Sequence, residues 1–172
     1  AGSRMSVERE AEASRAREAL ALAEAFTAVG VNATVPEDVI VAIWDKFMGI
    51  GPMSAVGAIT RAPAQGVQAV PELIENVTRQ ALEEALSVAH AKGVRLPDDI
   101  IEKKLQIMRD APPDTMASMA RDMVAGNVSE FDDLVGALIH LGESLGVSMP
   151  LMHTLYWCLK PQALRARGEV SF

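Results

Sequence analysis

Cysteine, aromatic residues and long apolar runs are all scarce in this sequence. Cys158 is the single cysteine, so the chain cannot form an intramolecular disulfide, and one unpaired thiol suits a reducing cytoplasm. No uninterrupted apolar run reaches about 18 residues and the start does not resemble a signal peptide, which argues against membrane insertion and secretion. These absences predict a cytoplasmic protein that makes no membrane contact.

Basic residues are outnumbered as well. The chain carries 16 Lys and Arg against 23 Asp and Glu, for a net charge of -7. Because nucleic acid is bound by a basic face, this balance argues against a nucleic-acid partner. Apolar residues make up 49% of the chain, which is enough for a buried core and too much for a disordered protein.

The length limits the domain content. A dinucleotide-binding fold takes roughly 150 residues, so the chain cannot hold one together with a complete substrate domain. We interpret residues 1–5, Ala-Gly-Ser-Arg-Met, as a cloning scar and residues 6–172 as one helical domain.

Apolar residues recur at intervals of three and four along most of the chain, and no segment alternates with period two. Prolines open several of these segments and glycines close them. The sequence therefore predicts an all-α bundle of about seven helices, one of them broken: 7–29, 36–49 with 53–59, 71–92, 97–108, 114–124, 129–145 and from 150 onward.

Three local features refine this prediction. The sequence Gly49-Ile50-Gly51-Pro52 is expected to break the second helix, since proline removes a backbone donor and glycine is a weak helix former. Residues 61–66 are expected to form a loop. Ser129 and Asp132 are expected to cap the following helix as a pair.

Self-contained catalytic motifs are missing from the sequence. It has no Gly-x-Gly-x-x-Gly, no Gly-x-x-x-x-Gly-Lys and no Gly-x-Ser-x-Gly. His90, His140 and His153 fall on three different predicted helices without metal-ligand spacing, so they predict surface or core-edge histidines rather than a metal site.

Three less ordinary positions remain. Lys46 lies beside an apolar stripe, where a lysine either extends to solvent or projects into a cleft as a proton donor. Ser118 and Asp122, four apart on one helix face, suit either a hydroxy-acid site or a merely polar surface. Glu130 at a predicted helix start is either a hydroxyl acceptor or an ordinary acidic residue near a helix N-terminus.

Taken in order, these segments resemble the C-terminal domain of the ketopantoate reductase (2-dehydropantoate 2-reductase) family. The resemblance covers residues 14–160. It rests on Trp44-Asp45-Lys46-Phe47, Ala58-Ile59-Thr60-Arg61, Ser118-Met119-Ala120-Arg121-Asp122, Ser129-Glu130-Phe131-Asp132 and Gly146-Val147-Ser148-Met149-Pro150.

The resemblance implies a helical domain like that of 6-phosphogluconate dehydrogenase, preceded by an N-terminal Rossmann domain that binds NADPH and is absent here. It implies that a 2-oxo acid, ketopantoate in pantothenate biosynthesis, is reduced between the two domains. Lys46 would be the catalytic proton donor, and Glu130 would hold hydroxyl groups of cofactor or substrate. The substrate contacts implied are Ser54, Ser118 and Asp122.

This sequence departs from the family at three asparagine positions, which are occupied by Ile50, Ser54 and, approximately, Ala64. The loss of amide groups weakens the expected recognition of a polyhydroxylated acid and leaves open a paralogous reductase that acts on a different 2-oxo acid. We expect no tightly bound NADPH and negligible reductase activity from this chain alone.

Two alternatives stay open from the sequence. One is a non-catalytic dimerisation or binding module, and the other is a reductase of the 3-hydroxyacid dehydrogenase type. Removal of the partner domain is expected to leave Met48, Met53, Met119 or Met123 partly uncovered, so that a homodimer could form.

Overall fold

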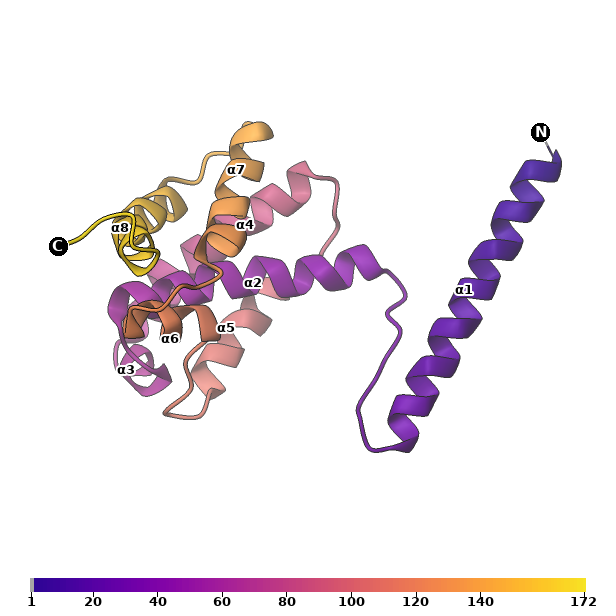
Figure 1. Ribbon diagram of the computed structural model, residues 1–172, viewed down its shortest axis with the longest axis horizontal. Coiled ribbons are helices and arrows are strands. Elements are labelled where there is room, and N and C mark those ends of the chain that lie inside the picture. Colours follow the sequence, from indigo (N-terminus) through magenta and orange to yellow (C-terminus); the bar gives the residue numbers. More distant parts are fainter. Residues whose placement is uncertain (1) are drawn as a thin grey trace. The chain divides into compact units, whose positions relative to one another are not determined.

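The structure is a computed structural model that describes residues 2–172, with side chains described from residue 15 onward. The prediction of an all-α fold is confirmed, since the described residues form helices and no strand (Figure 1). In order these are α1 (Gly2–Ala28), α2 (Val39–Thr60), α3 (Ala64–Gln68), η1 (Leu73–Thr78), α4 (Arg79–Ala91), α5 (Ile100–Asp110), α6 (Ser118–Ala125), η2 (Asp132–Gly136), α7 (Ala137–Ser144) and α8 (Pro150–Ala166). The labels η1 and η2 denote π-helical turns.

The chain divides into two compact units, Ala1–Ala42 and Ile43–Phe172. Ala1 of the supposed cloning scar lies outside the described residues, and α1 begins at Gly2. Gly30 ends α1 as predicted, with the left-handed φ of 84° that glycine adopts without strain. The apolar residues Leu20, Leu22 and Phe26 are 46–58% exposed, so α1 buries none of the stripe expected of it.

The second helix starts later and runs further than predicted. Asp38, rather than Pro36, caps it, because the Asp38 carboxylate accepts hydrogen bonds from the backbone N–H groups of Ile40 and Val41 at 2.8 and 3.1 Å. The expected break at residues 49–52 is wrong, since α2 continues through Pro52 to Thr60.

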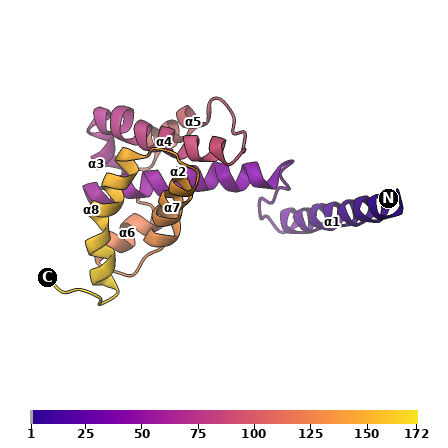
Figure 2. The same cartoon turned by 90° about the horizontal axis from the view of Figure 1, so that it is seen from above.

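Close packing of the second unit around α2 accounts for that continuity. Figure 2 shows α2 passing between α4 and α5 on one side and α6 and α7 on the other. A Cβ atom on Gly49 would lie 3.0 Å from the Lys104 side chain, and one on Gly57 would lie 3.3 Å from the Ala120 Cβ. Glycine therefore serves here for close helix packing, which outweighs its weak helix propensity.

Three other boundaries differ from the prediction. The short helix α3 begins inside the expected loop 61–66, and α6 begins at Ser118 instead of Asp114 or Thr115. The predicted helix 71–92 contains η1, where the buried Thr78 hydroxyl donates to the Leu73 carbonyl at 3.0 Å. The start of α3 depends on a contact distant in sequence, because the Ala64 N–H donates to the Thr115 carbonyl at 2.8 Å.

Two carboxylates attach α8 to the rest of the unit. The buried Glu84 of α4 accepts hydrogen bonds from the backbone N–H groups of Leu151 and Met152, at 3.0 and 2.8 Å, and so satisfies the N-terminus of α8. Asp132 accepts hydrogen bonds from Tyr156 and Lys160 instead of pairing with Ser129, so the predicted cap is wrong.

The methionines expected to be uncovered are mostly inside the core. Met48, Met119 and Met123 are buried, and only Met53 is half-buried. The exposed large apolar residues of α2 are instead Val39, Ile40 and Ile43 in its first turns and Ile59 near its end. By length and composition alone α2 could cross a membrane, but 44% of its most apolar window is buried, as in the core helix of a helical bundle.

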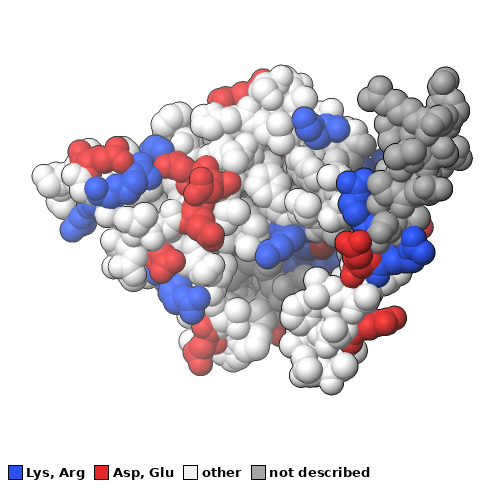
Figure 3. All heavy atoms as spheres, turned by 45° about the vertical axis from the view of Figure 1, so that its right-hand side comes forward, with Lys and Arg blue, Asp and Glu red and all other residues white. Residues whose placement is uncertain are grey.

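Charged side chains of both signs are interspersed on the molecular face drawn in Figure 3. The described residues also contain an ion-pair cluster in which Arg79 and Arg109 both bind Glu75 and Glu102. The Arg109 and Arg79 hydrogen bonds lower the pKa of Glu75. This face shows no basic patch of the kind that binds nucleic acid.

Candidate functional site

Lys46 extends from the partly exposed side of α2. Its residue is exposed, and among the described side chains it makes no ion pair or hydrogen bond. The neighbouring Asp45 instead pairs with Lys104 of α5 at 3.1 Å. The Lys46 ammonium group is therefore available to a ligand or to a second domain.

The residues that follow Lys46 on the same side of α2 form what we term the Lys46 stripe: Lys46, Ile50, Met53 and Gly57. Their spacing of four, three and four residues places them on one helix face. Ile50, Met53 and Gly57 are half-buried, whereas most residues around them on α2 are buried. The stripe is thus the side of this central helix that the bundle leaves partly open.

Ser118 and Asp122 lie at the first and fifth positions of α6. Ser118 is exposed and Asp122 is half-buried. Ala120, midway between them, packs toward Gly57 of α2, so helical geometry turns the Ser118–Asp122 face away from that contact. Both side chains therefore border the packed region on its solvent side.

Glu130 is exposed and lies at a bend before η2, one residue ahead of the first helical residue. Its backbone carbonyl accepts a hydrogen bond from the Leu134 N–H at 2.9 Å. Ser54 differs from the other predicted residues: its side chain has no exposed surface, and its hydroxyl has no hydrogen-bond partner. A ligand could reach Ser54 only if the surrounding core moved.

The structure brings the elements of the site together without joining the side chains directly. Gly57 connects α2 with α6, and a Cβ atom on Gly51 would lie 3.7 Å from the Leu134 carbonyl of η2. Among the described side chains, however, no hydrogen bond or ion pair links Lys46, Ser118, Asp122 and Glu130. These four polar groups are thus left for other molecules to contact.

Asp132, two residues beyond Glu130, is fixed by three donors. Tyr156, Lys160 and Arg167 donate to its carboxylate at 3.1, 2.7 and 2.8 Å. Burial alone would raise the pKa of Asp132, but the hydrogen bonds from Lys160, Arg167 and Tyr156 outweigh it and lower the pKa. The ionised Asp132 holds η2, and with it the position of Glu130, against α8.

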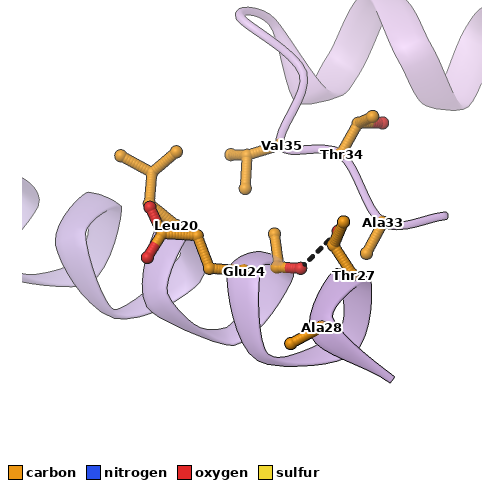
Figure 4. A pocket seen from close by; sticks show the side chains of 8 residues that line it. Leu20, Glu24, Thr27, Ala28, Ala33, Thr34 and Val35 are labelled. Atoms are coloured by element: carbon orange, nitrogen blue, oxygen red, sulfur yellow. Dashed lines mark hydrogen bonds between the residues drawn. The ribbon is translucent and has the colours of Figure 1, made fainter. Parts of the chain in front are cut away.

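Two surface hollows are lined by none of the predicted site residues Lys46, Ser54, Ser118, Asp122 and Glu130. One lies at the C-terminal end of α6 and includes Arg61 and Arg165. Arg61 has a left-handed φ of 55°, which its sequence does not predict because residues other than glycine rarely adopt this conformation. The other lies within the first unit, where Leu20, Thr27 and Val35 border it (Figure 4). There the Thr27 hydroxyl donates to the Ala23 carbonyl at 2.8 Å within α1.

No group of three His, Cys, Asp or Glu residues in the described part of the chain is arranged to hold a metal ion. His140 and His153, although on different helices, both approach Glu143, at 3.3 and 3.8 Å. The spacing of the histidines in the sequence does not predict this shared carboxylate.

Comparison with known proteins identifies the fold. The family model described as "Ketopantoate reductase PanE/ApbA C terminal" matches residues 38–163. The chain belongs to the ketopantoate reductase family. It corresponds to the C-terminal helical domain of that family, as the resemblance in the sequence predicted.

Relatives and solved structures agree with this assignment. The 2-dehydropantoate 2-reductase of Pyrobaculum aerophilum is 30% identical over 139 residues, covering 81% of this chain and 49% of the relative, and that of Caulobacter vibrioides is 29% identical over 130 residues, covering 76% and 44%. The crystal structure of a PanE/ApbA family ketopantoate reductase from Ralstonia eutropha JMP134 has a TM-score of 0.75 and 30% identity, with 86% of this chain and 49% of that chain covered.

The same fold occurs in a ternary structure of D-mandelate dehydrogenase with NADH and anilino(oxo)acetate, at a TM-score of 0.75 and 18% identity over 85% of this chain and 48% of that one. At this identity the likeness concerns the fold alone. The chain spans about half the length of the curated relatives it matches.

Proposed function

We propose that this chain is the substrate domain of a two-domain, cytoplasmic reductase that converts a 2-oxo acid into a 2-hydroxy acid with NADPH. The main observation in support is Lys46: it combines the family motif with an exposed ammonium group that has no ion-pair partner among the described side chains. A lysine without a carboxylate neighbour stays free to act on a substrate oxygen.

NADPH, when bound to a preceding Rossmann domain, supplies the hydride that is added to C2 of the substrate. Lys46 donates a proton to the C2 oxygen, which becomes the hydroxyl group of the product. A protonated lysine suits this role because it also stabilises the negative charge that develops on that oxygen.

The remaining polar residues bind the substrate or the cofactor and orient them. Ser118 donates a hydrogen bond to the substrate, and Asp122 on the same face of α6 helps to orient the site. Glu130 accepts hydrogen bonds from hydroxyl groups of cofactor or substrate, as an exposed carboxylate can. Ser54 receives no role in this proposal, because it is buried.

We assign the apolar first turns of α2 to a protein interface within a homodimer. Val39, Ile40 and Ile43 are each more than half exposed, at 57, 52 and 57%. A ketopantoate reductase of this fold from Staphylococcus aureus, 20% identical, is described as dimeric. Adjacent exposed aliphatic residues are typical of such contacts.

The catalytic assignment is tested by Lys46→Ala in the protein that joins this chain to its NADPH-binding domain. We expect kcat for a 2-oxo acid to fall by about 100-fold or more, which is the usual effect of losing a general acid. Lys92→Ala provides a matched control, since Lys92 is an exposed lysine at the end of α4. An unchanged rate in Lys46→Ala would exclude the proposed mechanism.

A further inference from the structure

An apolar cavity of about 170 Å³ lies between α2, α3, α5 and α6. Half of its lining consists of Gly or Ala, namely Gly57, Ala62, Ala64, Ala111, Ala117 and Ala120. Small residues at these positions leave space that larger side chains would fill. The cavity therefore follows from the residue choice on four separate elements.

The cavity begins where the Lys46 stripe ends. Met53 and Gly57, the last two residues of the stripe, both line it. On the α6 side Ala117 lines it, and Ala117 directly precedes Ser118. The cavity is thus continuous with the end of the Lys46 stripe on α2 and with the residue that precedes Ser118 on α6.

The lining offers few hydrogen-bond partners to a polar group. It contains no charged residue, and Thr115 is its only member with a side-chain hydroxyl. Ala64, which lines the cavity, and Ile50 of the stripe stand near positions where the resemblance to the family places asparagine, so two amide groups of the family pattern are missing here. A substrate hydroxyl in this space would exchange water for apolar neighbours and lose its hydrogen bonds.

We propose that this cavity binds the side chain of the substrate, and that the substrate is a 2-oxo acid with a branched aliphatic or phenyl side chain. The inference rests on the proposed function, which it makes more specific. An apolar cavity of about 150 Å³ in another protein holds benzene, so the volume found here is sufficient for either group. The carboxylate and the C2 carbonyl stay outside the cavity, toward Lys46 and Ser118.

A matched pair of substrates tests this assignment. Ketopantoate and 3,3-dimethyl-2-oxobutanoate differ only in that one methyl group of the latter carries a hydroxyl in ketopantoate. In the protein that joins this chain to its NADPH-binding domain, we expect kcat/KM to be about 10- to 100-fold higher for the acid without the hydroxyl, the range by which apolar pockets discriminate. Phenylglyoxylate should be reduced as well.

Variants at Ala64 test whether the substrate preference arises in the cavity. Ala64→Leu should fill the cavity and lower kcat/KM for phenylglyoxylate at least tenfold, whereas Ala64→Asn should shift the preference toward ketopantoate. Val70→Leu is the control, because Val70 is exposed, follows α3 and does not line the cavity. Circular dichroism of each variant verifies that it is folded.

The outcomes separate the two proposals. A preference for ketopantoate, or no response to Ala64→Leu in a folded protein, overturns the inference and leaves the reductase function intact. Failure to reduce any of the three acids overturns the reductase function, and with it the inference that rests on it. The result that supports both proposals is faster reduction of the apolar acids than of ketopantoate, together with the loss of this advantage in Ala64→Leu.

Discussion

Lys46 and Ser54, eight residues apart on α2, lie in opposite surroundings, because the Lys46 residue is exposed and the Ser54 side chain is buried. Lys46 was identified as a lysine beside an apolar stripe, and the structure places it on the open side of α2. Ser54, at a position where the family resemblance places asparagine, was expected to contact the substrate, yet it lies wholly inside the core. A motif fixes the position of a residue along a helix, but burial depends on neighbours that are distant in sequence.

Ser54 leads to a prediction about stability. Its hydroxyl is buried and has no hydrogen-bond partner, and such a group costs about 1–3 kcal/mol. We therefore expect Ser54→Ala to raise the free energy of unfolding, measured by urea denaturation, by about 1 kcal/mol.

The matched control for this change is Ser87→Ala. Ser87 also lies within a helix, but its hydroxyl is exposed and donates to the Glu83 carbonyl at 2.8 Å. Both substitutions gain the helix propensity of alanine, so the difference between them isolates the buried hydroxyl. Destabilisation by Ser54→Ala beyond that of Ser87→Ala would show that the hydroxyl has a partner.

At the scale of helices, the sequence predicted that the elements are helical and in which order they occur, but it did not predict that α2 is uninterrupted. The periodicity of apolar residues predicted the end of α4, the bounds of α5 to within three residues and the start of α8, because each buries one face of an amphipathic helix. It failed at Pro52, where packing against Lys104, Leu134 and Ala120 keeps α2 continuous. The π-helical turns η1 and η2 likewise leave no sign in the spacing of apolar residues.

The attachment of η2 to α8 should depend on pH. The pKa of Asp132 is lower in the folded state than its ordinary value near 4, so the folded protein binds fewer protons. Its contribution to stability is complete above that ordinary value and is lost as the pH falls through the lowered value. Because the side chain is about one-third exposed, we expect Asp132→Asn to cost only about 1 kcal/mol at pH 7.

Denaturation of the wild type and Asp132→Asn at pH 7 and at about pH 3 measures this effect. The difference in free energy of unfolding should shrink at the lower pH, since the wild-type carboxyl group then takes up a proton itself. Asp133→Asn, at the exposed neighbouring position, is the matched control for the change of residue type. If the difference in free energy of unfolding stayed the same at both pH values, Asp132 would stabilise the protein through its shape rather than through its charge.

At the scale of the whole molecule, composition excluded classes of protein, and only the ordered motifs pointed to a family. An acidic chain with one cysteine fits a large number of cytoplasmic proteins. The apolar cavity beside the Lys46 stripe could not have been predicted, because its twelve lining residues come from elements up to 67 positions apart, from Met53 to Ala120. Its shape exists only after these helices pack.

The last prediction concerns the 172-residue chain by itself. Pyrophosphate binding in dinucleotide folds relies on a glycine-rich turn between a strand and a helix, and the described residues contain no strand. Titration of NADPH, followed by its nicotinamide fluorescence, should therefore show no saturable binding up to about 1 mM. A Kd of about 1 mM corresponds to a binding free energy of about -4 kcal/mol. Saturation in the micromolar range would place a nucleotide site within the helical domain and would require a different division of labour between the two domains.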